Sequence, residues 1–580
     1  MRYSKLPVEE NEPYVLQDEQ PYRPSWHRKV VALVLVATFC LTNPWAPTLP
    51  SFTGKHHKCH HGTQYKGEKI SWQKAGEIEG RHLETSSIVV PMDQFNLTNS
   101  GDKTFNISLI RLRGKDGSPN LLLNPGGPGG SGAEFVYRRG KQLSEIVGDG
   151  YHLLSFDPRG INGSGPLASC YPDKKAAQQL SDVRDTEIVH DSPEVYAWTQ
   201  NFVKACEATT GEHAGYINTP QTAADMNSIL DAVGQEDLAY WGFSYGTVLG
   251  QTYASIFPNR STRVIIDGVA NNFVWYGDVF DGEQFTNTED VLEGFFDECI
   301  KAGKNCSLSS HAKTKDELHE KVFGYLADLK AQPLSVFLNA SDYGLLTYEN
   351  VLFDGIFPSL YKPASWYNLA DNLAQLLSGN ATAAWVAYGK NGGFGIEGEA
   401  NQFVTSNDGL SGPASGWPQD RETLLKQILS HVNESIFIPT ENSGYYLRQQ
   451  WTIPRTHNFT QKLGVQTAHP LLILSTSYDP ICPLVSAVSA FEAFEDSALV
   501  EVKGYGHCSV AVTSNCLAKR VREFLYNGTL PDGHVTCDVD GPYFIKPEED
   551  GKVVAQKHFD DPQDKKIHLA QLEMARDWEW

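Results

Sequence analysis

The sequence predicts an α/β fold: a mostly parallel central sheet flanked by helices, with an inserted, mainly helical cap domain. Two observations lead to this class. Short apolar runs have the length of buried strands, and each ends in a glycine-rich or polar turn. The 580 residues exceed one hydrophobic core, and the runs form two groups separated by a segment with apolar residues at helical spacing. The runs are residues 120–123, 151–156, 237–241, 471–476 and 498–502.

The N-terminal region has the features of a membrane-directed segment. An apolar run over residues 30–41 follows Arg28 and Lys29, and both basic residues favour a cytoplasmic N-terminus. Extended to residue 49, the run has the length of about 20 residues that a membrane span needs, although about 12 apolar residues also suit a signal peptide. We expect a single-pass type II membrane protein, with a secreted protein as the alternative. The predicted parts are a cytoplasmic tail (1–29), a signal anchor or signal peptide (30–49) and a juxtamembrane linker (50–79).

Sequons and cysteines indicate that the rest of the chain enters the secretory pathway. Ten N-x-[ST] sequons are typical of a lumenal or extracellular protein, and the 10 cysteines agree with an oxidising compartment. The glycosylation candidates are Asn96, Asn106, Asn339, Asn380, Asn433, Asn458 and Asn527.

Two strand-like runs lead into loops suited to acyl chemistry. The run 120–123 continues into Asn-Pro-Gly-Gly-Pro-Gly-Gly-Ser-Gly at 124–132, whose backbone N–H groups can face a developing oxyanion. The run 237–241 continues into Gly-Phe-Ser-Tyr-Gly at 242–246, and a helix-like segment follows. A serine on a strained strand-to-helix turn needs small residues two positions away on either side. We therefore expect Ser244 to be a nucleophile.

The remaining catalytic candidates follow downstream, in the order that hydrolases with such a serine turn use. Asp479 lies in the turn after the strand-like run 471–476, and His507 lies in the glycine-rich loop after the run 498–502. We expect His507 to act as the general base and Asp479 to orient it. The hydrolase core is therefore predicted to have two parts, residues 80–275 and residues 463–540, and both contribute residues to the site.

The segment over residues 276–462 is predicted to be the cap. Apolar residues recur at three and four positions in residues 291–302 and 315–329, which favours helices. A cap above a serine selects substrates by size. Its acidic residues Asp281, Glu283 and Glu289 are candidates, each weak, for binding a substrate amino group.

The motifs together resemble the α/β-hydrolase family of tripeptidyl aminopeptidase-like (TAP-like) proteins and proline iminopeptidases, which are serine exopeptidases. The matching stretches frame about residues 80–540, with the TAP-like part at 463–540. The resemblance implies Ser244, Asp479 and His507 as the triad. It also implies the N–H groups of Gly127 and Tyr245 as oxyanion donors.

Four cysteine pairs are hypotheses. Cys482 lies three residues after Asp479 and Cys508 directly follows His507, so a formed triad draws both thiols together and would allow a disulfide. The other three candidate pairs are Cys170 with Cys206, Cys299 with Cys306, and Cys516 with Cys537.

Composition and motif searches exclude several other classes. A formal net charge of −22 argues against nucleic acid as a partner, because phosphate binding needs a basic face. Residues 56–61, His-His-Lys-Cys-His-His, lack the spaced ligand pairs of zinc sites, so we expect a solvated loop and no metal. Phosphate-binding, zincin and dinucleotide motifs do not occur, and we expect no cofactor.

The function expected from the sequence is that of a serine exopeptidase that releases short peptides from substrate N-termini through an acyl-enzyme. A carboxylesterase or lipase on the same triad is one alternative, because the triad leaves the acyl group open. A non-catalytic binding or adhesion module on a hydrolase scaffold is the other. Residues 541–580 are expected to form a charged, solvated C-terminal tail.

Overall fold

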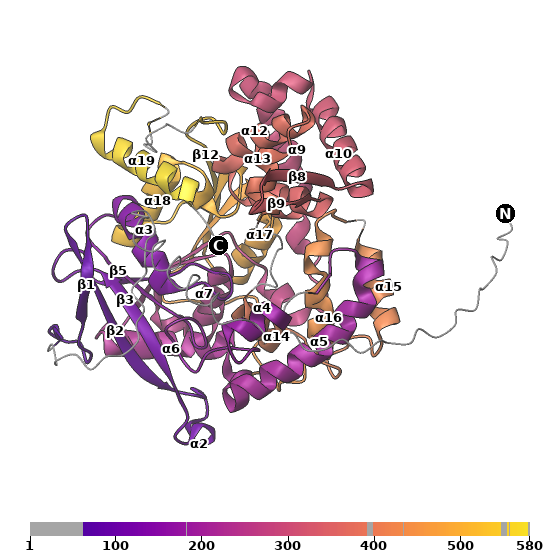
Figure 1. Cartoon of the computed structure of the whole chain (residues 1–580). Helices are drawn as coiled ribbons and strands as arrows, with labels where there is room; N and C mark the ends of the chain where they lie inside the picture. Colours follow the sequence, from indigo (N-terminus) through magenta and orange to yellow (C-terminus); the bar gives the residue numbers. More distant parts are fainter. Residues whose placement is uncertain are drawn as a thin grey trace, which may run out of the picture. The chain divides into compact units, whose positions relative to one another are not determined.

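A ten-stranded sheet lies at the centre of the protein (Figure 1). The computed structural model describes residues 62–180, 183–390, 398–432, 434–546, 554–555 and 557–577. The predicted cytoplasmic tail (1–29), the predicted anchor (30–49) and linker residues 50–61 lie outside these ranges. Strand order is β1-β2-β3-β5-β4-β6-β7-β10-β11-β12. The strands are β1 Gln73–Ile78, β2 Arg81–Pro91, β3 Thr104–Leu112, β4 Asn120–Asn124, β5 His152–Phe156, β6 Leu238–Phe243, β7 Ser261–Asp267, β10 Leu472–Tyr478, β11 Ala498–Tyr505 and β12 His534–Asp538.

The pairing confirms a mostly parallel sheet. The first three strands pair antiparallel, as does β3 with β5, and every neighbouring pair from β5 to β12 is parallel. The strands β4, β5 and β6 are buried along their whole length, which explains their continuous apolar sequences. The parallel strands therefore place their following loops at one edge.

Helices cover both faces of the sheet. Alternate strand residues enter different cores: Leu122 and Tyr240 belong to one, and Leu121 and Trp241 to the other. The first core includes residues of α6 Thr219–Ala232, α7 Tyr245–Ile256 and α17 Leu484–Ala493. The second includes residues of α3 Gly132–Val147, α18 Asn515–Asn527 and α19 Pro562–Asp577.

The inserted segment forms a cap with a hydrophobic core of its own, built around aromatic side chains such as Phe295 and Trp366. Its elements include α9 Thr288–Ala302, α10 Lys315–Ala331, β8 Leu334–Asn339, β9 Asp342–Leu346, α12 Trp366–Leu377, α14 Glu399–Asp408, α15 Arg421–His431 and α16 Asn442–Gln450. Short helices elsewhere in the chain or between these elements are α2 Leu97–Ser100, α4 Lys174–Leu180, α8 Asn272–Gly277, α11 Phe357–Tyr361 and α13 Thr382–Ala384.

One helix from the first core segment also belongs to the cap. Helix α5 Ile188–Thr210 runs beside α15 and α16 (Figure 1) and places Ile188 and Val195 in the cap core. The cap is thus larger than residues 276–462.

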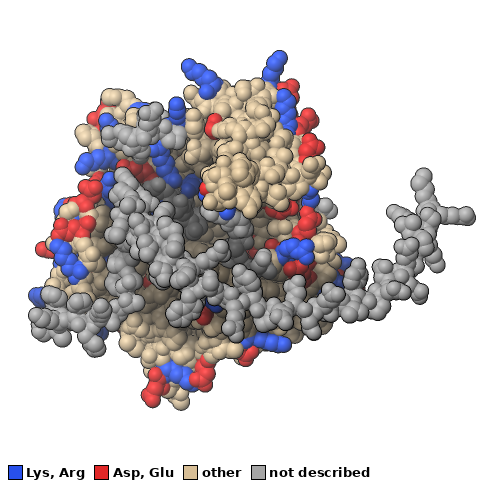
Figure 2. All heavy atoms as spheres, in the orientation of Figure 1, with Lys and Arg blue, Asp and Glu red and all other residues tan. Residues whose placement is uncertain are grey.

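In Figure 2 the surface over the β8–β9 region is mostly free of charged side chains.

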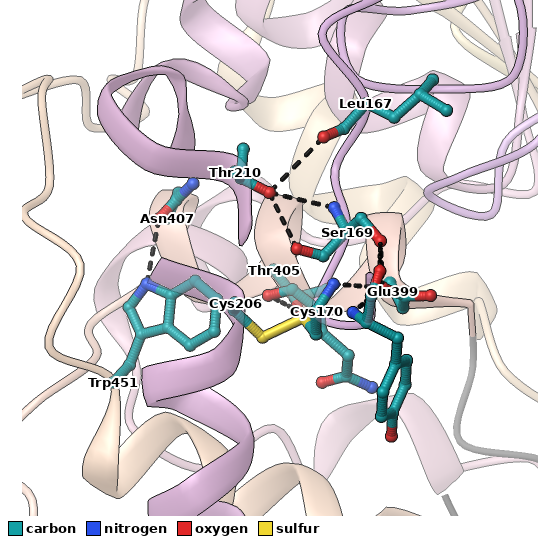
Figure 3. The surroundings of a disulfide bond; sticks show 11 residues. Leu167, Ser169, Cys170, Cys206, Thr210, Glu399, Thr405, Asn407 and Trp451 are labelled. Carbon is teal, nitrogen blue, oxygen red and sulfur yellow. Dashed lines mark hydrogen bonds between the residues drawn. A yellow bond between two sulfur atoms is a disulfide. The ribbon is translucent and has the colours of Figure 1, made fainter. Parts of the chain in front are cut away.

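Three of the four candidate disulfides are present: Cys170–Cys206, Cys299–Cys306 and Cys516–Cys537. The first joins the loop after β5 to α5, and Figure 3 shows Glu399 of α14 beside it. The Glu399 carboxylate accepts hydrogen bonds from the Cys170 N–H and, at 2.9 Å, from the Ser169 hydroxyl. The disulfide and these hydrogen bonds therefore fasten α5 and α14 to the loop after β5.

The C-terminal region differs from the predicted solvated tail. Helix α19 packs against α3, with Ile567, Ala570 and Met574 buried. These residues recur at three and four positions, so one face of the charged helix is apolar. The prediction was wrong because the overall charge of the segment concealed this face.

The surface features bear on the cellular compartment. Six of the seven glycosylation candidates are exposed, and Asn433 lies outside the described residues. Among the helices of the described residues, none has both the length and the apolarity that a bilayer span requires.

Candidate active site

Ser244 occupies the turn between β6 and α7, as the sequence predicted. Its backbone has φ 56° and ψ −123°, and the residue is 9% exposed. A Cβ at Gly242 would lie 2.3 Å from the Gly246 carbonyl oxygen, and one at Gly246 would lie 2.8 Å from that of Asn124. The two glycines are therefore required by close backbone packing around the serine.

Asp479 and His507 form a buried pair at the same edge of the sheet, after β10 and β11. The His507 Nδ1 atom lies 2.9 Å from both carboxylate oxygens of Asp479, and the two residues are 1% and 0% exposed. The carboxylate also accepts the N–H groups of Ile481, Cys482 and Cys508 at 2.8–3.0 Å. Because these bonds fix Asp479, the imidazole has a fixed orientation, with Nδ1 toward the carboxylate.

Cys482 connects the serine with this pair. Burial raises the pKa of its thiol well above the ordinary value, Asp479 and Asp281 raise it further, and a hydrogen bond with the Ser244 side chain opposes the rise. One ligand atom each of Asp479, Cys482 and His507 lies within 4.8 Å of the other two. The three predicted triad residues thus surround one thiol.

The predicted disulfide between Cys482 and Cys508 is wrong, because both are free, buried thiols. The two thiols contact different parts of Ser244: the Cys482 thiol contacts its side chain and the Cys508 thiol its backbone. Cys508 packs its Sγ against Gly268, where a Cβ would lie 2.4 Å away, and Cys482 faces Ser244. Their positions near Asp479 were predicted correctly, but side-chain direction was not.

Gly127 and Tyr245 are the predicted oxyanion donors. They follow the adjacent strands β4 and β6, which pair in parallel with Asn124 opposite Gly242. Tyr245 is the first residue of α7, so its N–H has no partner within the helix. Within the described ranges, neither N–H donates to a protein acceptor. Their role as oxyanion donors stays a prediction.

Asp267 is a site residue that the sequence reasoning missed. It ends β7, and its carboxylate accepts the N–H and hydroxyl of Ser509 at 2.7 and 2.6 Å. Burial raises its pKa to about 6, partly opposed by these hydrogen bonds and that from Trp241. Asp267 therefore positions the loop that follows His507, and its place at a strand end on the catalytic edge was the available signal.

The cap contacts both loops of the buried pair. The His507 N–H donates to the Tyr361 carbonyl at 2.9 Å, and the Tyr361 ring meets the imidazole edge to face at 5.2 Å. Thr288 donates its hydroxyl to the Pro480 carbonyl at 2.6 Å. The cap thus lies directly against the catalytic loops.

The three acidic candidates have different surroundings. Asp281 lies close enough to Cys482 to raise the pKa of that thiol, and burial raises its own pKa to about 6. Glu283 accepts hydrogen bonds from Asn271 at 3.0 Å and Ser486 at 2.6 Å. Glu289 instead accepts the Ile436 N–H at 3.0 Å. Of the three, only Asp281 raises the pKa of the Cys482 thiol, which contacts the serine.

Residues 441–537 match the family model described as TAP-like protein. The second part of the hydrolase core is therefore similar to TAP-like α/β-hydrolases. The serine protease Hip1 of Mycobacterium tuberculosis is 25% identical over 445 residues, covering 74% of this chain and 83% of that protein. The tripeptidyl aminopeptidase of Streptomyces lividans is 25% identical over 431 residues, covering 72% and 76%. A further relative, carboxylesterase B of Mycobacterium tuberculosis, is 23% identical over 434 residues, covering 72% and 79%. This α/β-hydrolase is an enzyme of the serine peptidase type.

Proposed function

We propose that this hydrolase is an exopeptidase that releases short peptides from the free N-termini of its substrates. The observation that carries the proposal is the buried serine beneath the cap, with Asp281 beside the thiol that contacts it. A covered nucleophile admits chain ends more easily than the middle of a folded chain. A buried carboxylate suits the ammonium group of a substrate N-terminus.

In the proposed reaction, Ser244 attacks the scissile carbonyl carbon while His507 Nε2 takes the hydroxyl proton. The N–H groups of Gly127 and Tyr245 hold the oxyanion, and Asp479 stabilises the imidazolium. The imidazolium then protonates the leaving amine, and an acyl-enzyme remains on Ser244. Water, activated by His507, hydrolyses the ester and regenerates the serine.

The test compares the full-length protein with Ser244→Ala on three substrates: a peptide amide with a free N-terminus, its N-acetylated form and a short acyl ester. We expect the free peptide to be cleaved preferentially, and Ser244→Ala to lower kcat/KM by at least about a thousandfold. Equal cleavage of the acetylated peptide would contradict exopeptidase specificity. Activity that survives in Ser244→Ala would contradict the proposed nucleophile.

Asp281 is proposed to bind the substrate ammonium group. Asp281→Asn keeps the side-chain shape but removes the charge, so we expect KM for the free peptide to rise at least about tenfold. Glu289→Gln is the matched control, because Glu289 accepts a cap N–H at another position. An equal rise in KM in both variants would assign the effect to general electrostatics.

A carboxylesterase is the second candidate, supported by the name of the carboxylesterase B relative. The same triad serves ester hydrolysis. Turnover of the acyl ester without turnover of either peptide would favour this activity.

We also propose a secretory-pathway location with residues 30–49 as a type II anchor. The three disulfides and the exposed sequons support an oxidising, glycosylating compartment. We expect a glycosidase-sensitive mass shift, and retention in membranes after alkaline carbonate extraction. Release by carbonate would favour a secreted form, and absence of the mass shift would contradict glycosylation.

A further inference from the structure

We propose that Cys482 and His507 form an inhibitory binding site for a zinc ion beside Ser244, with Asp479 holding the imidazole from behind. The site would make the hydrolase reversibly sensitive to free zinc. Its inhibitory effect rests on the proposed catalytic role of His507, whereas binding of the ion does not.

The donor atoms are suitable for zinc in type and spacing. Thiolate sulfur and imidazole nitrogen are common zinc ligands, with Zn–S about 2.3 Å and Zn–N about 2.0–2.1 Å, so two donors of one tetrahedral ion lie about 3.6 Å apart. One ligand atom each of Asp479, Cys482 and His507 already lies within 4.8 Å of the others, and all three residues are buried. For a nitrogen and a sulfur at that upper distance, an approach of about 1 Å is enough to share an ion.

Asp479 would serve in the outer shell. Its oxygens already accept the His507 Nδ1–H and the N–H groups of Ile481, Cys482 and Cys508. A carboxylate on one imidazole nitrogen typically orients the other nitrogen toward a bound zinc ion. Zinc would therefore take His507 Nε2 together with Cys482 Sγ, and solvent would complete the coordination.

Zinc at this position would block the chemistry directly. The lone pair of Nε2 that accepts the Ser244 proton would be engaged in the metal bond. The Cys482 thiol contacts the Ser244 side chain, so the ion would also lie beside the nucleophile. On binding, the thiol proton passes to solvent, two coordination bonds form and nothing is oxidised. Asp479 and Asp281, both close to the thiol, would offset the positive charge.

The binding test uses Co²⁺, which replaces Zn²⁺ and produces a thiolate charge-transfer absorption band. Residues 56–61 contain Cys59 and four histidines, so every protein carries Cys59→Ser. We expect the absorption band in the Cys59→Ser protein. We also expect it in the double variant Cys59→Ser with Cys508→Ser, which removes the other buried thiol. The band should disappear in Cys482→Ser, whose fold is checked by circular dichroism. If that variant is unfolded, Cys482→Ala replaces it.

The inhibition test measures peptide or ester hydrolysis with increasing ZnCl₂, followed by EDTA. We expect reversible inhibition, and a half-inhibiting zinc concentration at least about tenfold higher in Cys482→Ser than in Cys508→Ser. A band that persists in Cys482→Ser, or equal zinc sensitivity of the two variants, would overturn the proposal. If the enzyme lacks measurable hydrolysis, the proposed function fails, and the cobalt band alone still decides the metal site.

Discussion

The Ser244 backbone is held in a conformation that costs a non-glycine residue of order 1–3 kcal/mol. Three contacts stabilise it: the Ser244 N–H donates to the Asp267 carbonyl at 3.0 Å, and the Thr247 N–H and hydroxyl donate to the Ser244 carbonyl at 2.7 and 2.6 Å. The strain keeps the hydroxyl exposed to a substrate carbonyl. Small residues around the turn are therefore a functional requirement.

Gly242→Ala tests this requirement. The new Cβ would lie 2.3 Å from the Gly246 carbonyl oxygen, so the turn must shift. We expect a loss of about 1–3 kcal/mol in the free energy of unfolding and a large loss of hydrolysis. Gly324→Ala, in α10 with no atom near its Cβ, is the control and should be neutral or stabilising. Equal effects of the two variants would contradict the argument.

Asp267 should produce a pH-dependent stability. Burial raises its pKa to about 6 from 3.8, so the native state binds this proton more tightly than the unfolded chain does. Its stabilising contribution is complete below about pH 4 and is lost as pH rises through about 6. Relative to wild type, Asp267→Asn should gain up to about 3 kcal/mol between these pH values. Calorimetric Tm values for both proteins at each pH check this, and a constant Tm difference would contradict it.

At the scale of elements, the Cys170–Cys206 disulfide fastens α5 near the junction of core and cap. The bond closes a loop with a sequence separation of 36 residues, which corresponds to about 4 kcal/mol of unfolded-state entropy. We expect Cys170→Ala with Cys206→Ala to lower Tm and to increase proteolysis of the cap. The pair Cys299→Ala with Cys306→Ala, whose separation is 7, should cost less. The reverse order of Tm values would contradict this loop-length argument.

Helix α19 should contribute to stability although its sequence is highly charged. Met574 is 0% exposed in the core shared with α3. Met574→Ala should lower the free energy of unfolding by about 2–5 kcal/mol, because it leaves a cavity. Chemical denaturation measures the change, with the exposed Lys566→Ala as control. A Met574 variant as stable as the control would show that α19 is dispensable.

At the scale of the whole molecule, we expect the cap to restrict which substrates reach Ser244. Its contacts with His507 and Pro480 place it against the catalytic loops. We therefore expect an extended polypeptide incubated with the full-length protein to lose residues successively from its N-terminus, as followed by mass spectrometry. The Ser244→Ala protein is the control. Early internal fragments made by wild type alone would contradict a restrictive cap.

The sequence by itself determined the features that depend on neighbouring residues. Short runs of residues predict the buried strands and the serine turn, because strand alternation and glycine requirements act within a few positions. Three disulfide pairs were also correct. The acidic residues were less predictable: all three lie at the start of the cap, yet only Asp281 raises the pKa of the Cys482 thiol beside the serine.

Only the tertiary structure decided how distant segments meet. The α5 contribution to the cap, the buried face of α19 and the role of Asp267 all depend on packing between elements far apart in the chain. The directions of the Cys482 and Cys508 side chains depend on backbone geometry at two loops, where a rotation about one bond separates or joins two sulfur atoms. Sequence patterns encode local conformation, whereas such contacts arise only when the whole sheet and its cap are assembled.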